Sequence, residues 1–223
     1  MPAATREPRA PTKRASTSPQ PKKKAARRRN ATGVQLGEDE VRSRILQAGA
    51  MVFAQSGVRA ASVEDILLVS GISRRTFYRF YEGKEDVMLA LYNLGTEGLL
   101  GACRFAVAST HDPLLRFERC IDAHLQNARG LARLIFVLGG EAQHHESPLY
   151  VRRREVHDQL VQLLAHAPGM PALDELMVRA MILALEGVVR FMLEQGDEGR
   201  SVSSSELARA KKMLLQLCSG ALA

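Results

Sequence analysis

The stretch GISRRTFYRFYEGKED, residues 71–86, is the most distinctive part of the sequence. Within it, residues 74–81 hold three arginines, four aromatic residues and one threonine, whereas the whole chain of 223 residues has only 7 Phe, 4 Tyr and no Trp. A chain with so few aromatic residues has placed four of them side by side among three arginines. This concentration predicts a short element that needs aromatic anchoring and presents positive charge.

A helix that begins at Ser73 explains the pattern. With 3.6 residues per turn, Phe77, Phe80 and Tyr81 lie at i, i+3 and i+4 and share one face. A helix this short is not stable alone, so we expect these rings to anchor it to a core. The other face would carry the remaining side chains: Arg74, Arg75, Tyr78 and Arg79.

Two further helix signals precede this stretch and suggest a helix-turn-helix. Val41, Ile45, Ala48, Val52 and Phe53 have helical spacing, and Gly57 stands where that helix would end. Ser62-Val-Glu-Asp65 has the form of a capping box, and Gly71 would end the helix that it starts. Three helices with such a turn between the last two are typical of DNA-binding proteins.

The alternative for this stretch is an ordinary amphipathic helix with a charged outer face. Residues 37–82 contain six basic and six acidic residues, so the segment as a whole is not a basic patch. No acidic residue occurs from Ile72 to Tyr81, however, and the acids elsewhere are expected near helix starts or away from the arginines. We therefore favour DNA binding, with arginines placed for base edges and phosphates.

From residue 38 onward the pattern is helical and strand signals are missing, so we predict an all-α fold. We expect the chain to divide into a basic tail (1–36), a helix-turn-helix domain (37–83) and a larger helical domain (84–223). About nine helices are expected, from capping residues and apolar spacing. Their predicted ranges are 39–55, 62–69, 73–80, 84–108, 113–127, 129–138, 148–166, 171–195 and 203–221.

Residues 41–88, VRSRILQAGAMVFAQSGVRAASVEDILLVSGISRRTFYRFYEGKEDVM, resemble the N-terminal DNA-binding domain of the TetR family of transcriptional regulators. The resemblance rests on Ile45, Leu46, Ala48 and Phe53, on Gly57, on Ser62-Val63-x-x-Ile66, on Gly71-Ile72-Ser73, and on Thr76-x-Tyr78-x-x-Tyr81 followed by Lys84-Glu85. Beyond these 48 residues it extends only through the number and length of the helices.

The resemblance implies a recognition helix from Ser73 to Tyr81 and a set of DNA contacts. Arg74 and Arg75 would reach base edges, although the family often has a small residue at the second position. Phosphate or flanking contacts would come from the other members of the set: Ser62, Ser73, Thr76, Tyr78, Arg79 and Lys84.

The resemblance also implies a dimer, and the last two long helices carry apolar stripes suited to one. The alternative is that the stripes form an ordinary core within one chain. The predicted dimerisation residues are Val178, Ile182, Leu185, Val189, Met192, Leu207, Ala210, Leu214 and Leu217. The family places an effector cavity among the middle helices, and plain core packing is again the alternative. The candidate lining residues are Leu91, Leu94, Arg104, Phe105, Phe117, His124, Leu134, Phe136, Gln143 and Met181.

The net charge of +7 belongs to the tail, which holds ten Lys or Arg and one Glu, a charge of +9 that leaves −2 for the rest. We expect the tail to be disordered, as a solubilising leader or as a sequence-blind clamp on DNA phosphates. The hypothesis from the whole sequence is a homodimeric transcriptional repressor, released from its double-stranded DNA operator by a small organic effector. The alternative is a nucleoid-type protein that binds nucleic acid non-specifically through the tail.

The remaining expectations are absences and a location. The sequence has no G-x-S-x-G, P-loop, H-E-x-x-H or glycine-rich fingerprint, so we do not expect an enzyme, a cofactor or a metal site. Cys103, Cys120 and Cys218 are widely separated and predict reduced, buried thiols, with a redox-sensing thiol as the alternative. No apolar run approaches a membrane span and no secretory signal is evident, which favours a cytoplasmic protein.

Overall fold

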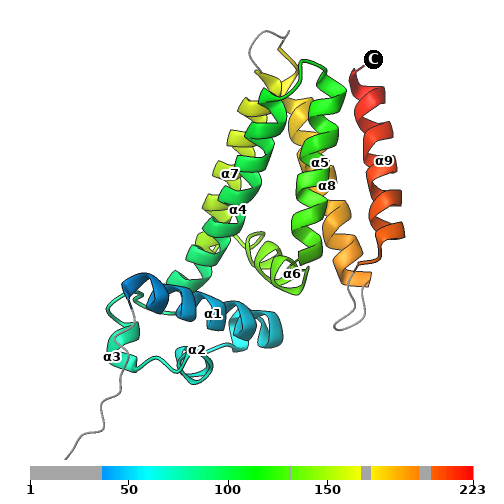
Figure 1. The fold of residues 1–223 in the computed structure, drawn as a ribbon. Coiled ribbons are helices and arrows are strands. Elements are labelled where there is room, and N and C mark those ends of the chain that lie inside the picture. The colour runs from blue at the N-terminus through cyan, green and yellow to red at the C-terminus, as the bar shows by residue number, and fades with distance from the viewer. Residues whose placement is uncertain (1–36, 131, 167–171, 196–201, 223) are drawn as a thin grey trace, which may run out of the picture. The chain divides into compact units, whose positions relative to one another are not determined.

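The computed structural model describes residues 37–130, 132–166, 172–195 and 202–222. In this part of the chain all regular structure is helical, without a strand, and nine helices follow one another (Figure 1), so the predicted all-α fold is confirmed. The predicted basic tail lies outside the described residues. The helices are α1 (Glu38–Ala60), α2 (Val63–Ser70), α3 (Arg74–Phe77), α4 (Lys84–Ala108), α5 (Pro113–Gly130), α6 (Ala132–Glu141), α7 (Pro148–Ala165), α8 (Glu175–Gln195) and α9 (Ser204–Leu222).

Several helices begin at side-chain caps, whereas α1 and α4 follow glycines without one. Asp112 Oδ1 accepts hydrogen bonds from the amides of Leu114 (2.9 Å) and Leu115 (3.2 Å) ahead of α5. Ser147 Oγ accepts one from the Leu149 amide before α7, and Ser203 forms a reciprocal capping box with Glu206 before α9. These caps satisfy amide groups that have no partner within the helix, which explains why local sequence determines where α5, α7 and α9 begin.

Some helix bounds differ from the prediction. α1 runs to Ala60 and does not end near residue 55, although Gly57 (φ 77°) interrupts its helical geometry where the sequence predicts the end. α3 ends at Phe77, and residues 78–80 continue as a turn rather than as helix. α8 begins at Glu175 and not near Pro171, which lies outside the described residues. Residues 172–174 are not helical, and Asp174 Oδ1 accepts a hydrogen bond from the Met177 amide at 2.8 Å. An aspartate cap therefore starts α8 where the proline rule placed the start too early.

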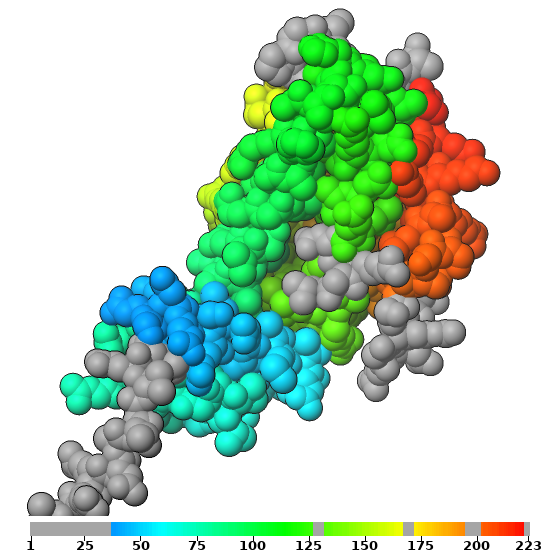
Figure 2. Space-filling view, viewed as in Figure 1, coloured from blue at the N-terminus to red at the C-terminus, as the bar shows by residue number. Residues whose placement is uncertain are grey.

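The described residues form two hydrophobic cores that meet along α4. The first joins α1, α2, α3, the start of α4, α6 and the start of α7, and includes Ile45, Phe53, Ile66, Phe77, Met88 and Leu149. The second joins the rest of α4 with α5, α7, α8 and α9, and includes Leu100, Phe117, Leu160, Val178 and Leu214. The space-filling view shows α4 and α5 (green) lying side by side, with α9 (red) along α5 (Figure 2).

α1 and α4 approach each other closely at Gly49. A Cβ atom on Gly49 would lie only 2.5 Å from Cγ1 of the fully buried Val87, a distance that real Cβ atoms do not adopt. Only a residue without a side chain fits at this crossing. α1 and α4 therefore cross with the backbone of α1 packed directly against the Val87 side chain of α4.

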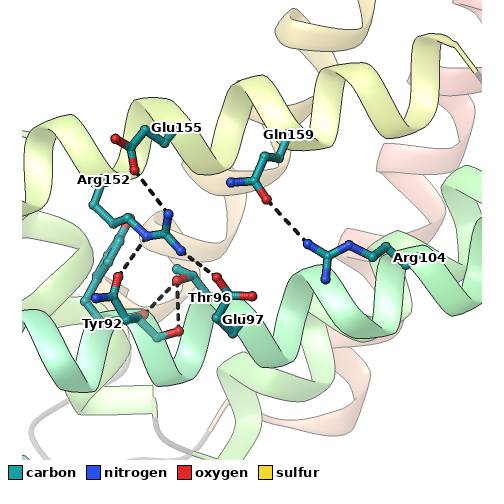
Figure 3. Close-up of polar contacts among 8 residues, drawn as sticks. Tyr92, Thr96, Glu97, Arg104, Arg152, Glu155 and Gln159 are labelled. Carbon is teal, nitrogen blue, oxygen red and sulfur yellow. Dashed lines mark hydrogen bonds and ion pairs between the residues drawn. The ribbon is translucent and has the colours of Figure 1, made fainter.

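α4 is also joined to α7 by polar contacts (Figure 3). Arg152 Nε donates to Asn93 Oδ1 (2.8 Å), its Nη2 donates to Glu97 Oε1 (2.6 Å), and its Nη1 donates to Glu155 Oε2 (3.1 Å). The Arg152 side chain is only 20% exposed, so one guanidinium joins three side chains at a largely buried point. In the described part of the chain, no helix is long and apolar enough to cross a bilayer.

Candidate nucleic-acid interface and ligand cavity

α3 is held to the first core by its aromatic residues, as the sequence predicts. Phe77 is fully buried and Tyr81 is 8% exposed, while Phe80 is half-buried. The ring of Tyr78 meets that of Phe77 edge-on with centroids 5.4 Å apart, but Tyr78 itself is exposed. Rings therefore anchor α3 from one side and leave its other side open to solvent.

The turn before α3 is fixed by local hydrogen bonds. Ser62 Oγ accepts from the Asp65 amide at 3.2 Å, and Asp65 Oδ2 accepts from the Ser62 amide at 2.9 Å, which is the predicted capping box. The hydroxyl and amide of Ser62 lower the pKa of Asp65. Gly71 ends α2 in the left-handed region at φ 66°, and Ser73 Oγ caps α3 by accepting from the Thr76 amide. α2 and α3 thus form a helix-turn-helix.

The arginines of α3 point outward, but two of them have carboxylate partners. Arg74 pairs with Glu64 of α2, and Arg79 Nη2 lies 3.2 Å from Glu38 Oε1 of α1. Glu38 and Glu64 stand in the first turns of α1 and α2, as the sequence predicts, but these helix starts lie beside the arginines. Both pairs are about 60% exposed, and exposed pairs contribute only ~0–1 kcal/mol. A phosphate can replace such a carboxylate at little cost.

Arg75 differs from its two neighbours. It is exposed and has no hydrogen bond or ion pair with any residue that the structure describes. Thr76, also assigned to DNA, has its hydroxyl 2.8 Å from that of Ser73. Of the predicted contact residues, Arg75 and Tyr78 are therefore the most available to a partner.

The Lys84 side chain donates hydrogen bonds to the protein's own backbone. Its Nζ donates to the carbonyl oxygens of Val58 (2.9 Å) and Ala61 (2.7 Å) at the end of α1, with Arg59 O at 3.4 Å. Carbonyl groups at a helix C-terminus attract a cation. The ammonium group has three N–H bonds, so these contacts leave no donor for the phosphate role that the family resemblance implies.

A cavity of about 760 Å³ lies among α1, α4, α5, α6, α7 and α8. Its size is typical of small-molecule sites, which are roughly 300–1,000 Å³. Most of its lining side chains are apolar. Of the candidates named from the sequence, the cavity is lined by Leu91, Leu94, His124, Leu134, Phe136 and Gln143.

The other four candidates lie away from this cavity. Phe105 is 77% exposed on α4, and Arg104 donates to Gln159 on α7 at 3.4 Å (Figure 3). Phe117 and Met181 border a separate small pocket of about 40 Å³ between α5, α8 and α9. All four have helical spacing that fits a lining position, but the rotation of α4, α5 and α8 turns them elsewhere.

Sequence reasoning missed a polar cluster at the cavity wall. Arg153 of α7 donates from Nε to Glu186 Oε1 of α8 at 2.8 Å and makes a second bond from Nη2 to Oε2. His157 Nε2 lies 3.7 Å from Glu186 Oε2. Burial alone would raise the pKa of Glu186, but the hydrogen bond from Arg153 and neighbouring positive charges lower it overall. A charged residue one turn beyond Ile182, within an apolar stripe, was the available signal.

Burial near this cluster also shifts the pKa of its neighbours. It raises the pKa of Tyr92 to about 12, with Glu186 adding to the effect. It lowers the pKa of His124 to about 4, where Glu186 acts to raise the pKa and His157 to lower it. Burial likewise lowers the pKa of His157. Both histidines are therefore neutral at pH 7 and add no charge to the cavity.

The buried His124 predicts a loss of stability in acid. The unfolded chain takes up a proton below the ordinary histidine pKa of 6.5, whereas the folded chain resists protonation until about pH 4. The contribution of His124 to the free energy of unfolding is therefore fully present above about pH 6.5. It falls by as much as ~3 kcal/mol between pH 6.5 and pH 4, at 1.36 kcal/mol per pKa unit. Urea unfolding at pH 7.5, 6 and 4.5 measures this fall in the free energy of unfolding. His124→Gln should flatten the slope, whereas His144→Gln, at an exposed site, should not; equal slopes would contradict the prediction.

The residues assigned to dimerisation lie mainly in the chain's own core. Val178, Ile182, Val189, Ala210 and Leu214 are all buried in the monomer. Another apolar face of α8 is exposed and follows helical spacing: Leu176, Ala180, Leu183, Gly187 and Phe191. On α9, Met213 and the predicted Leu217 are 42% and 54% exposed. The surface available to a second copy therefore lies on the opposite side of α8 from the predicted stripe.

Cys103, Cys120 and Cys218 are free and buried, as predicted. Cys103 of α4 and Cys120 of α5 both line the cavity, and each thiol affects the pKa of the other. Their interaction lowers the pKa of Cys103 and, with burial, raises that of Cys120. The buried environment suits their packing role in the second core.

The helix-turn-helix region matches a known family model. Residues 45–91 match the model for bacterial regulatory proteins of the tetR family. A curated relative, the HTH-type transcriptional activator FasR of Mycolicibacterium smegmatis, is 29% identical over 94 residues. This match covers 42% of the chain and 43% of the relative, so the chain matches less than half the length of that protein.

Solved structures share the fold over most of the chain. The fatty acid degradation regulator FadR from Bacillus halodurans has a TM-score of 0.66 at 20% identity, covering 78% of this chain and 94% of its own. A TetR-like transcriptional regulator from Rhodococcus sp. RHA1 also has a TM-score of 0.66 at 20% identity, covering 84% and 98%. Residues 45–91 therefore match the tetR family of bacterial regulatory proteins, and the described part of the chain shares the fold of these regulators.

Proposed function

We propose that the protein is a homodimeric, sequence-specific repressor that a small organic effector releases from its DNA operator. Residues 37–83 would bind DNA, and residues 84–223 would bind the effector and a second copy. FadR is named as a fatty acid degradation regulator and FasR as a transcriptional activator. Transcription in vitro from the bound promoter tests repression. A repressor should reduce the amount of transcript, whereas an activator would increase it.

The DNA-binding part of the proposal is supported by the outer side of α3. Arg75 and Tyr78 are exposed without a competing partner among the described residues, and Arg74 and Arg79 have only exposed carboxylate partners. A recognition helix reads base edges in the major groove with such residues, and arginine can form a bidentate contact with guanine. α3 is thus suited to sequence-specific contacts.

The single observation that carries the effector part is that α1 belongs to both sites. Leu46, Gln47 and Ala50 of α1 line the cavity, whereas Ile45 and Phe53 of the same helix pack in the core that holds Phe77. A molecule in the cavity would therefore contact the helix on which α3 rests. A coupling free energy of about 1–3 kcal/mol is sufficient for a 5–150-fold change in DNA affinity.

The dimer would use the exposed faces of α8 and α9. Leu183, Phe191 and Leu217 are apolar and at least 45% exposed, an arrangement that costs free energy unless another surface covers it. A two-fold axis brings the same patch of both copies together. Such a dimer would place its recognition helices in successive major grooves, about 34–36 Å apart.

Replacing Arg75 by Ala tests DNA reading. We expect operator affinity to fall by about 5–150-fold, equivalent to the ~1–3 kcal/mol of a good arginine–guanine pair, with little change on unrelated DNA. Fragments selected from genomic DNA would supply the operator, and footprinting would measure protection. Arg59→Ala, on the exposed end of α1, is the control. Unchanged sequence preference would remove Arg75 from base reading, and protection of one half-site only would contradict the dimer.

A further inference from the structure

One arginine at the cavity forms no ion pair with the residues that the structure describes. Arg190 lies on α8, one turn after Glu186, and its Nη1 is buried without a hydrogen-bond partner among the described residues. Its guanidinium carbon lies 5.5 Å from the centre of the Phe136 ring on α6. The nearby Gly140 has no side chain, and a Cβ there would be 3.3 Å from Nη1. Buried N–H groups without a partner are rare because each costs free energy.

The other charged groups in the cavity wall do not neutralise Arg190. Glu186 is already held by two hydrogen bonds from Arg153. His124 and His157 are uncharged at pH 7, because burial lowers the pKa of both. Asp39 and Arg42 also line the cavity, but both are exposed to solvent. Within the described lining, the half-buried Arg190 is therefore a positive charge without a paired carboxylate.

The remainder of the cavity favours hydrocarbon. Side chains such as Leu99, Leu160, Leu185 and Leu193 line it beside Phe136. An apolar wall gains free energy by covering CH₂ groups, whereas a cation in such a wall gains most from an anionic acceptor. The two requirements together describe a molecule with a hydrocarbon body and one anionic head.

We propose that the cavity binds an amphipathic monocarboxylate, whose carboxylate accepts hydrogen bonds from Arg190 and whose hydrocarbon body lies against the leucine-rich wall. This inference rests on the proposed effector role of the cavity and specifies the chemistry of the effector. Arg190 then has its missing partner only when the ligand is present.

Calorimetric titration with matched eight-carbon probes tests the proposal. Octanoate should bind at least tenfold more tightly than 1-octanol, since it gains a hydrogen bond between two charged groups, and octylamine should bind least. Affinity should rise about fourfold for each CH₂ added, measured up to dodecanoate. Equal binding of octanoate and 1-octanol, or no binding of any alkyl carboxylate of 8 to 12 carbons, would overturn the proposal.

Variants separate recognition by Arg190 from general effects of charge. Arg190→Met should remove the preference for octanoate and leave 1-octanol affinity within about twofold, because its length and apolar contacts are similar. Arg133→Gln is the matched control: Arg133 also lies over the Phe136 ring, at 5.7 Å, but is exposed and does not line the cavity. Thermal unfolding would confirm that both variants fold. If Arg190 only packs on Phe136 with water on Nη1, Arg190→Met would leave octanoate affinity unchanged; an equal loss in both variants would also overturn the proposal.

DNA binding measured on the same samples distinguishes this inference from the proposed function. If octanoate binds through Arg190 but does not release operator DNA, the ligand inference stands and the effector role fails. If neither the wild type nor the variants bind DNA selectively, the regulator proposal fails. The comparison of octanoate with 1-octanol then still decides whether Arg190 recognises a carboxylate.

Discussion

Replacing Phe77 by Ala is expected to lower the free energy of unfolding by about 3–5 kcal/mol, the range for buried Phe-to-Ala changes. Phe77 is fully buried, and its ring contacts those of Tyr78 and Tyr81, with centroids 5.4 and 6.0 Å away. α3 has only four residues and no stability of its own, so it depends on this ring. The variant should therefore lose α3 before the second core unfolds.

Two measurements check this expectation. Urea unfolding followed by circular dichroism gives the change in free energy. Hydrogen exchange should show faster exchange at the Phe80 and Tyr81 amides, which donate to the Phe77 carbonyl at 2.9 and 3.1 Å. Phe80→Ala is the matched control, because its half-buried ring lies against Arg42 and its loss should cost only about 1 kcal/mol. Equal costs at the two positions would show that Phe77 is not the main anchor.

Replacing Arg153 by Met should cost about 3 kcal/mol or more at pH 7. The Arg153 and Glu186 side chains are only 16% and 24% exposed, so the change leaves a largely buried carboxylate without its guanidinium. Removing one partner of a buried pair typically costs ~3–5 kcal/mol, whereas replacing both with apolar residues is often neutral. Arg153→Met with Glu186→Leu should therefore recover most of the stability.

The pH dependence of this loss is a second readout. With Arg153 present, the pKa of Glu186 is lowered, so the pair stabilises the fold above the ordinary pKa of 4.5 and loses that effect as pH falls below it. Without Arg153, burial would raise the pKa of Glu186, and His157 could pair with it once protonated. The difference between wild type and Arg153→Met should shrink from pH 7 to pH 5 in thermal unfolding. A constant difference, or a double variant as unstable as the single one, would contradict this account.

Local sequence predicted the helices well because their starts depend on residues only two or three positions apart. Ser62, Ser73, Ser147 and Ser203 all cap the helices expected of them. The error at α8 has the same origin, since Asp174 is also a cap residue and stands closer to the helix than the proline. Anchoring of α3 by Phe77 and Tyr81 followed from helical spacing in the same way.

The site was less predictable because it depends on which neighbour each helix face meets. Helical spacing identifies an apolar stripe on α8, but not whether Val178 and Val189 face the chain's own core or a second copy. Phe105 has the same local pattern as a cavity residue, yet the rotation of α4 exposes it. The bond between Arg153 and Glu186 joins residues 33 positions apart, beyond the reach of any local pattern.

The close crossing at Gly49 has a mechanical consequence. Because Cγ1 of Val87 already lies against the α1 backbone at Gly49, α1 and α4 cannot move closer together at this crossing. We therefore expect a shift of α4 toward α1 to move α1 as well. Through Ile45 and Phe53 of α1, that movement would reach the core that holds Phe77 and α3.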